Sequence, residues 1–71
     1  MKYETQIVHR DRWYFVIVRP FRAFLGIVLW RDKTWRVLPW KFLSKGEAVR
    51  LCKNVKPAMR GKYHPKAAFN A

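Results

Sequence analysis

The sequence predicts an α+β fold, in which an antiparallel sheet of three to four strands carries one C-terminal helix packed on one face. Three observations favour this fold. The first half of the chain contains runs of aromatic and β-branched residues. Prolines and short polar breaks separate those runs, and a helical apolar pattern follows Ser44. The 71 residues suffice for a single small domain.

The first two strands are predicted over residues 3–10 and 13–18, with a turn at Asp11 and Arg12 between them. Every residue from 13 to 18 is aromatic or β-branched, which makes this run the clearest strand of the chain.

Pro20 is expected to end the second strand, because proline has no N–H to donate to a β-ladder. Residues 19–22 are therefore predicted to connect to a third strand over residues 23–30. Gly26 lies inside that third strand, where a glycine predicts a bulge or a close backbone approach.

A tight hairpin is expected at residues 31–33, which form a short polar break. The next strand is predicted over residues 34–38. Pro39 is expected to end or bend it, and residues 40–43 continue in an extended conformation.

The helix is predicted to begin after Ser44, because Ser44 and Glu47 match the capping-box pattern. In that motif the serine hydroxyl and the glutamate carboxylate each accept a hydrogen bond from the other residue's backbone amide. Pro57 is expected to end the helix beyond Asn54. One apolar face is expected from residues at steps of three and four, which are Ala48, Leu51, Cys52 and Val55.

The chain is expected to divide into a folded domain over residues 1–56 and a basic tail over residues 57–71. The tail carries scattered cations, a glycine and two prolines without apolar periodicity, which predicts a flexible segment. Tyr63 or Phe69 is the expected anchor if the tail contacts the domain.

Positive charge is the dominant property of the composition. The chain has 16 Lys and Arg against four Asp and Glu, a formal net charge of +12. Such a surplus favours a polyanionic partner, which can be nucleic acid, an anionic membrane or an acidic protein surface.

The remaining composition bounds the cellular context. Cys52 is the one cysteine, so the chain cannot form an intramolecular disulfide. Residues 1–6 are polar and do not resemble a secretory signal, and no apolar stretch approaches the length of a membrane span. We expect a cytoplasmic protein without stable membrane insertion.

The predicted strands are apolar on both faces, whereas one helix covers only part of one face. The second face is therefore expected to be covered by the tail, to pack against a second copy as a homodimer, or to serve as a binding platform.

Cations and aromatic residues alternate at the predicted strand ends, which is typical of nucleic-acid binders because cations neutralise phosphates and aromatic rings stack on bases. Trp30 and Trp35 are the expected exposed aromatics, because they flank the predicted hairpin tip. The full set of candidate nucleic-acid-binding residues is Arg10, Arg12, Trp30, Arg31, Lys33, Trp35, Arg36, Arg50, Lys53, Lys62 and Lys66.

The strand–helix junction from Phe42 to Leu51 resembles the arm-type DNA-binding domains of phage integrases and the AP2-like domains. The matching residues are Phe42, Ser44, Lys45, Glu47 and Ala48. In those families a three-stranded sheet enters the major groove of DNA and a helix packs behind it. The resemblance implies that sheet positions around residues 31–36 face DNA. This chain departs from the families in its more apolar strands and its basic tail.

Catalysis is not expected. The four acidic residues have no paired spacing, Cys52 lies on the apolar helix face, and neither His9 nor His64 has metal-ligand spacing with it. We therefore expect no enzyme activity, no metal and no cofactor.

The sequence favours a small nucleic-acid-binding protein, with DNA preferred over RNA, that acts as a regulator or accessory factor of a phage or mobile element. The alternative is a small phage-type inhibitor or adaptor that binds an acidic surface of a larger host protein or enzyme. Association with a membrane surface ranks last of the three, because the pattern is strand-like and is broken by prolines.

Overall fold

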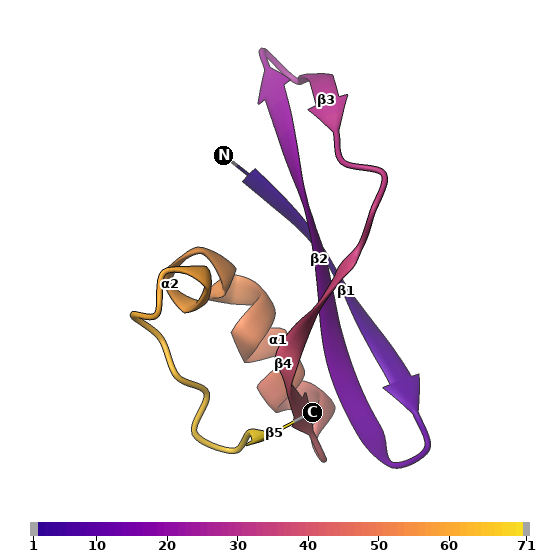
Figure 1. Cartoon of the computed structure of the whole chain (residues 1–71), viewed down its shortest axis with the longest axis vertical. Coiled ribbons are helices and arrows are strands. Elements are labelled where there is room, and N and C mark those ends of the chain that lie inside the picture. Colours follow the sequence, from indigo (N-terminus) through magenta and orange to yellow (C-terminus); the bar gives the residue numbers. More distant parts are fainter. Residues whose placement is uncertain (1, 71) are drawn as a thin grey trace.

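A computed structural model describes residues 2–70 (Figure 1). Its elements are β1 (Lys2–Arg10), β2 (Trp13–Phe24), β3 (Ile27–Arg31), β4 (Arg36–Phe42), α1 (Lys45–Lys53), α2 (Val55–Met59) and β5 (Phe69–Asn70). Every strand pairing is antiparallel, which confirms the predicted α+β fold with an antiparallel sheet. The sheet has five strands rather than three or four.

β2 is the long central strand of the sheet. β1 pairs with one edge of β2 over its whole length, across the predicted turn at Asp11 and Arg12. Along the other edge, β3 pairs with the C-terminal part of β2 and β4 with the N-terminal part. β3 and β4 thus lie end to end, like one strand interrupted at residues 32–35. The predicted hairpin at residues 31–33 is wrong, because β3 and β4 both pair with β2.

Pro20 explains this interruption. The predicted strand end at Pro20 and the predicted connection over residues 19–22 are wrong, because β2 continues to Phe24. The carbonyl of Pro20 accepts a hydrogen bond of 3.0 Å from the amide of Asp32, so this edge of Pro20 faces the break between β3 and β4. The N–H and C=O of a strand residue point to the same edge, so the donor that proline lacks is missing at this break. Pro20 therefore interrupts the neighbouring strand rather than its own.

A two-residue turn at Leu25 and Gly26 joins β2 to β3. Phe24 pairs with Ile27 to close the turn, and its two central residues have φ angles of 51° and 80°. Positive φ at both positions is the geometry of a type I′ hairpin. The predicted single strand over residues 23–30 is therefore wrong, because its glycine closes a hairpin.

β4 also continues through a proline. The strand runs to Phe42 with Pro39 exposed in its middle, so of the two predicted outcomes Pro39 does not end the strand, and the predicted extended continuation is confirmed as far as Phe42. The pairing between β4 and β2 shifts register between Phe15 and Ile17. A proline is tolerated where the ladder is irregular, because its missing donor costs no regular hydrogen bond there.

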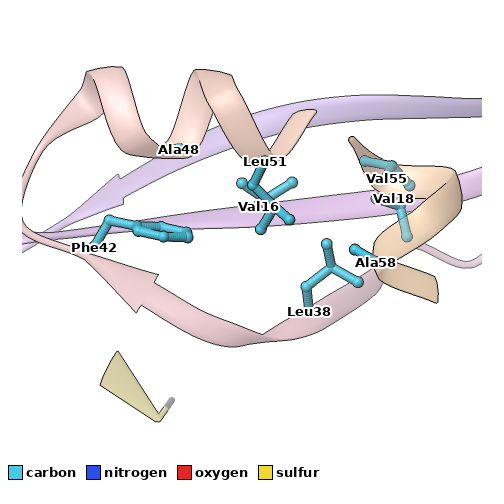
Figure 2. Close-up of a cluster of buried hydrophobic side chains, with 8 residues drawn as sticks. All are labelled: Val16, Val18, Leu38, Phe42, Ala48, Leu51, Val55 and Ala58. Carbon is cyan, nitrogen blue, oxygen red and sulfur yellow. The ribbon is translucent and has the colours of Figure 1, made fainter. Parts of the chain in front are cut away.

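The hydrophobic core lies between the helices and one face of the sheet (Figure 2). β2, β4, α1 and α2 contribute two buried residues each: Val16 and Val18, Leu38 and Phe42, Ala48 and Leu51, and Val55 and Ala58. Of the four residues predicted to form the apolar helix face, three belong to this core and Cys52 is half-buried against it. The predicted face is confirmed for Ala48, Leu51 and Cys52 of α1. Val55 belongs to α2, so the prediction of one helix that ends at Pro57 is wrong.

α1 begins directly after Ser44, as predicted, but without the hydrogen bonds of a capping box. The Ser44 side chain makes no capping hydrogen bond. The backbone carbonyl of Ser44 accepts from the amide of Ala48 at 3.4 Å, and the Glu47 carboxylate lies 3.9 Å from Arg50. The sequence pattern therefore places the helix start correctly, but the backbone of Ser44, and not its side chain, makes the first hydrogen bond to the helix.

The C-terminal segment differs from the flexible tail that the sequence predicts. α2 contains Pro57 in its first turn, where a proline is tolerated, and contributes Ala58 to the core. Tyr63 and Ala68 pack against that core, and β5 pairs with the outer edge of β4. Residues 57–70 therefore extend both the helical layer and the sheet.

Candidate nucleic-acid interface

The two faces of the sheet have different surroundings. The face that carries Val16 and Val18 packs against α1 and α2, and we call it the helix face. Side chains at the alternate strand positions point the opposite way, onto a face that we call the open face. The open face includes Lys2, Glu4, Gln6, Val8 and Arg10 of β1, Trp13, Phe15, Ile17, Arg19 and Phe21 of β2, Arg31 of β3, Val37 and Lys41 of β4, and Phe69 of β5. It continues into the β2–β3 hairpin through Ala23 and Val28.

The centre of the open face is apolar and slightly hollowed. Val8, Phe15, Ile17 and Val37 line a shallow hollow of about 340 Å³, with Arg10 at its border. Val37 is 63% exposed, whereas Phe15 and Ile17 are half-buried. This strip offers a flat apolar surface to a ligand without any rearrangement of the sheet.

A first cation–aromatic group lies at one end of the strip. Arg10 pairs with Trp13 across β1 and β2, and Nζ of Lys41 lies 4.2 Å from the centroid of the Trp13 ring. Phe69 of β5 packs edge-on against the same ring, with the centroids 5.3 Å apart. The contacts with Lys41 and Phe69 hold the Trp13 ring on this face, and we call the set of Arg10, Trp13 and Lys41 the Trp13 cluster.

A second group lies at the other end of the strip. The Glu4 carboxylate bridges two guanidinium groups: its Oε2 lies 3.0 Å from Nη2 of Arg19, and its Oε1 contacts Nε of Arg31. Cζ of Arg19 lies 4.3 Å from the centroid of the Trp35 ring. We call the set of Glu4, Arg19, Arg31 and Trp35 the Arg19 cluster. Its two guanidinium groups and one carboxylate leave a net positive charge.

The two clusters are separated by the apolar strip. Trp13 and Arg19 are six residues apart in β2, a distance of roughly 20 Å along an extended strand. The open face therefore presents positive charge at both ends and aromatic and aliphatic side chains between them.

The structure brings three of the predicted site residues onto this face: Arg10, Arg31 and Trp35. Arg12 lies in the β1–β2 turn, close to Arg10 in the chain. Lys33 lies exposed in the connection between β3 and β4. The prediction that Trp30 and Trp35 flank a hairpin tip is wrong. Trp30 lies in β3 and is 47% exposed, and Trp35 is half-buried under Arg19.

The other predicted residues lie away from the open face. Arg36 pairs with the buried Val18 and so belongs to the edge of the helix face. Arg50 and Lys53 lie exposed on α1, and Lys62 and Lys66 in the C-terminal segment. These residues therefore do not form one continuous surface with the open face.

Lys53 does belong to a second basic surface. It borders a hollow of about 470 Å³ between the start of β1 and the two helices, together with Lys2 and Lys56.

Sequence reasoning missed Arg19 and Lys41, the cations that lie over the two tryptophans of the open face. Because Pro20 predicts the end of a strand, the sequence places Arg19 in a connection rather than in β2. Its side chain is then not expected on the same face as Trp13. The signal was the series Trp13, Phe15, Ile17 and Arg19, which occupies every second position of one strand.

Few of the cations have an acidic partner within the described chain. Among residues 2–70, three of the 16 Lys and Arg side chains lie within 4.0 Å of a carboxylate, namely Arg19, Arg31 and Arg50. The positive surplus is therefore spread over the surface, free to meet an anionic ligand.

No protein-family model, curated protein or solved structure matches this chain. Across the described range, no helix has the length and apolar character needed to cross a bilayer. No group of three His, Cys, Asp or Glu side chains within residues 2–70 is placed to bind a metal ion.

Proposed function

We propose that this protein binds nucleic acid, and specifically DNA, through the open face of its sheet. The observation that carries the proposal is the arrangement of the Trp13 and Arg19 clusters at opposite ends of one uncovered apolar strip. Phosphate groups bind the cations at the two ends, where they displace condensed counterions. Bases lie against the strip between them, where the ring of Phe15 supplies a stacking surface and Val8, Ile17 and Val37 supply apolar contacts.

The geometry suits an extended ligand. The clusters lie roughly 20 Å apart along β2, so each can contact a different phosphate of one strand or one groove. The cations are held in place before binding, because Arg19 is fixed by Glu4 and Trp35 and Lys41 lies over Trp13. Such preorganisation reduces the entropy lost when side chains are immobilised.

The resemblance to the integrase arm-type and AP2-like domains supports the same face. It implies that the sheet, with the helix behind it, faces DNA around residues 31–36. Arg31 and Trp35 lie on the open face in accordance with this expectation, whereas Arg36 lies at the edge of the helix face.

The test is a mobility-shift panel with single- and double-stranded DNA and RNA at two salt concentrations. Two charge-reversal variants are compared: Arg10→Glu with Lys41→Glu on the open face, and Arg50→Glu with Lys53→Glu on α1. Both change the net charge equally. We expect the open-face variant to lose at least about tenfold more affinity than the α1 variant, because only the former faces the bound phosphates. Equal losses would show that binding follows net charge without a defined face.

A second candidate function is docking on an acidic surface of a larger protein. The exposed Val37 and Val8 of the apolar strip favour it, because protein interfaces bury apolar centres inside a charged rim. Capture of a partner from a lysate that persists after nuclease treatment, together with no binding in the mobility-shift panel, is the expected result of this alternative.

A further inference from the structure

The β2–β3 hairpin extends away from both helices and carries a dense apolar surface (Figure 1). We call residues 23–29 the hairpin tip. Leu25 is 85% exposed, and Phe24, Ile27 and Leu29 are each about two-thirds exposed. Exposed apolar surface this concentrated on a small monomer marks a contact site rather than ordinary surface variation.

Folding alone does not account for Leu25. Its φ of 51° lies in the left-handed region, where asparagine, aspartate and glycine are favoured and a branched apolar residue is disfavoured. Its side chain is almost fully exposed, so its packing offsets little of this cost. A strained residue with an exposed apolar side chain is therefore evidence for a role in contact with a partner.

The hairpin is layered by chemistry along its length. Beyond the turn, the pairs Phe24–Ile27 and Ala23–Val28 are entirely apolar, and the tip has no charged or hydrogen-bonding side chain. The next pair is Arg22 with Trp30, followed by Phe21 with Arg31. The apolar part, from Leu25 back to Arg22, is three residues long, which corresponds to roughly 10 Å.

This order matches the depth profile of a lipid bilayer interface. Apolar side chains enter the boundary of the acyl chains. Tryptophan and arginine lie at the level of the headgroups, where arginine contacts the anionic phosphates. Interfacial segments bury their apolar side by about 5–10 Å, which is comparable to the length of the tip. The net charge of +12 adds attraction to an anionic surface.

Two other occupants fit the tip less well. The floor of a DNA groove presents polar base edges and its walls present phosphates, and the tip offers no side-chain donor or acceptor to replace the water that these groups would lose. A second copy of the chain carries the same charge of +12, so mutual repulsion opposes contact between two tips.

We propose that the hairpin tip inserts into the interfacial region of an anionic phospholipid bilayer, with Arg22, Trp30 and Arg31 at the headgroups. The chain then lies at the membrane surface and does not span it. The tip lies beyond the apolar strip, and Arg31 belongs to both proposed surfaces. Insertion of the tip does not require nucleic-acid binding.

The test is co-sedimentation with vesicles of phosphatidylglycerol and phosphatidylcholine, compared with vesicles of phosphatidylcholine alone. We expect binding to the anionic vesicles and at least about tenfold weaker partitioning of Leu25→Asn, because one leucine no longer enters the apolar layer. The matched control is Leu43→Asn, the same substitution at a residue that is 54% exposed next to the opposite end of β2. Circular dichroism verifies that both variants are folded.

A second readout follows the depth of Trp30. Phosphatidylcholine brominated on its acyl chains should quench part of the tryptophan fluorescence of the bound protein. Trp30→Phe should remove most of that quenching, whereas Trp40→Phe should not, because Trp40 packs against the core.

Three results would overturn the proposal. Equal partitioning of Leu25→Asn and the unchanged chain would show attraction by charge alone. Loss of DNA affinity in Leu25→Asn with no vesicle binding by either chain would identify the tip as a wedge between base pairs. A concentration-dependent dimer that Leu25→Asn dissociates, again without vesicle binding, would identify a second copy as the occupant.

Discussion

The guanidinium of Arg19 lies between two partners, with Glu4 accepting its hydrogen bonds and the Trp35 ring 4.3 Å away on its face. The same carboxylate also contacts Arg31, and its Oε1 is shielded from solvent. One acidic side chain thus positions two cations on the open face and at the same time cancels part of their charge.

Replacing Glu4 by glutamine should therefore increase affinity for DNA. The Glu4→Gln substitution removes the carboxylate that competes with phosphate for Arg19 and Arg31, and the salt dependence of binding should become steeper by about one unit in a log–log plot. Fluorescence titration at several salt concentrations measures both quantities. The control is Glu47→Gln, the same change on α1 beside Arg50. An equal gain in both variants would contradict the placement of DNA on the open face.

The core predicts that truncation of two leucines lowers the free energy of unfolding by very different amounts. Leu51 of α1 is fully buried against the sheet (Figure 2). Leu43 is 54% exposed. Leu51→Ala should lower the free energy of unfolding by about 2–5 kcal/mol through lost burial and the cavity that remains. Leu43→Ala should lower it by less than about 0.5 kcal/mol. Urea unfolding followed by circular dichroism compares them, and similar losses would be inconsistent with this core.

The sequence predicts the first strand, the start of the second strand and the start of the helix, because these depend on local composition. The run from Trp13 to Val18 consists of aromatic and β-branched residues, and the apolar steps from Ala48 to Val55 fit a helix. Both elements carry their signal in their own residues, and tertiary contacts then reinforce it.

The two prolines and the second hairpin were not predictable in the same way. Pro20 predicts a strand end because the sequence alone does not show which edge of the strand lacks the proline N–H. In the structure that edge faces the break between β3 and β4. The turn at Leu25 and Gly26 lacks the asparagine or aspartate that normally precedes the glycine in a type I′ turn, so the polar residues 31–33 looked like the better hairpin.

The candidate site was predictable in its residue types but not in its geometry. The sequence predicts a site made of cations and tryptophans, but which face of the sheet each of them occupies depends on strand register. Moving Arg19 from a connection into β2 places it opposite Glu4 and on the side of Trp13. Register is set by pairing across the sheet, which no local pattern specifies.

Ser44 allows a direct test of the capping box. An N-cap serine whose hydroxyl bonds to the helix is typically worth about 1 kcal/mol relative to alanine. Because the Ser44 side chain makes no such bond, Ser44→Ala should change the free energy of unfolding by less than about 0.5 kcal/mol. Thermal unfolding monitored by circular dichroism gives the value. A loss of about 1 kcal/mol or more would show that the capping bond forms in solution.

The last prediction concerns Leu25→Asn, which should raise the free energy of unfolding and at the same time weaken binding to a membrane. Asparagine tolerates positive φ better than leucine, so Leu25→Asn should raise the free energy of unfolding by several tenths of a kcal/mol, up to about 1 kcal/mol. The control is Ile27→Asn, which makes a comparably exposed position polar within β3, where the chain is extended and a β-branched residue is favoured. That variant should be destabilised. A substitution at residue 25 that stabilises the hairpin while weakening its binding to a membrane would show that leucine is kept there for contact rather than for folding.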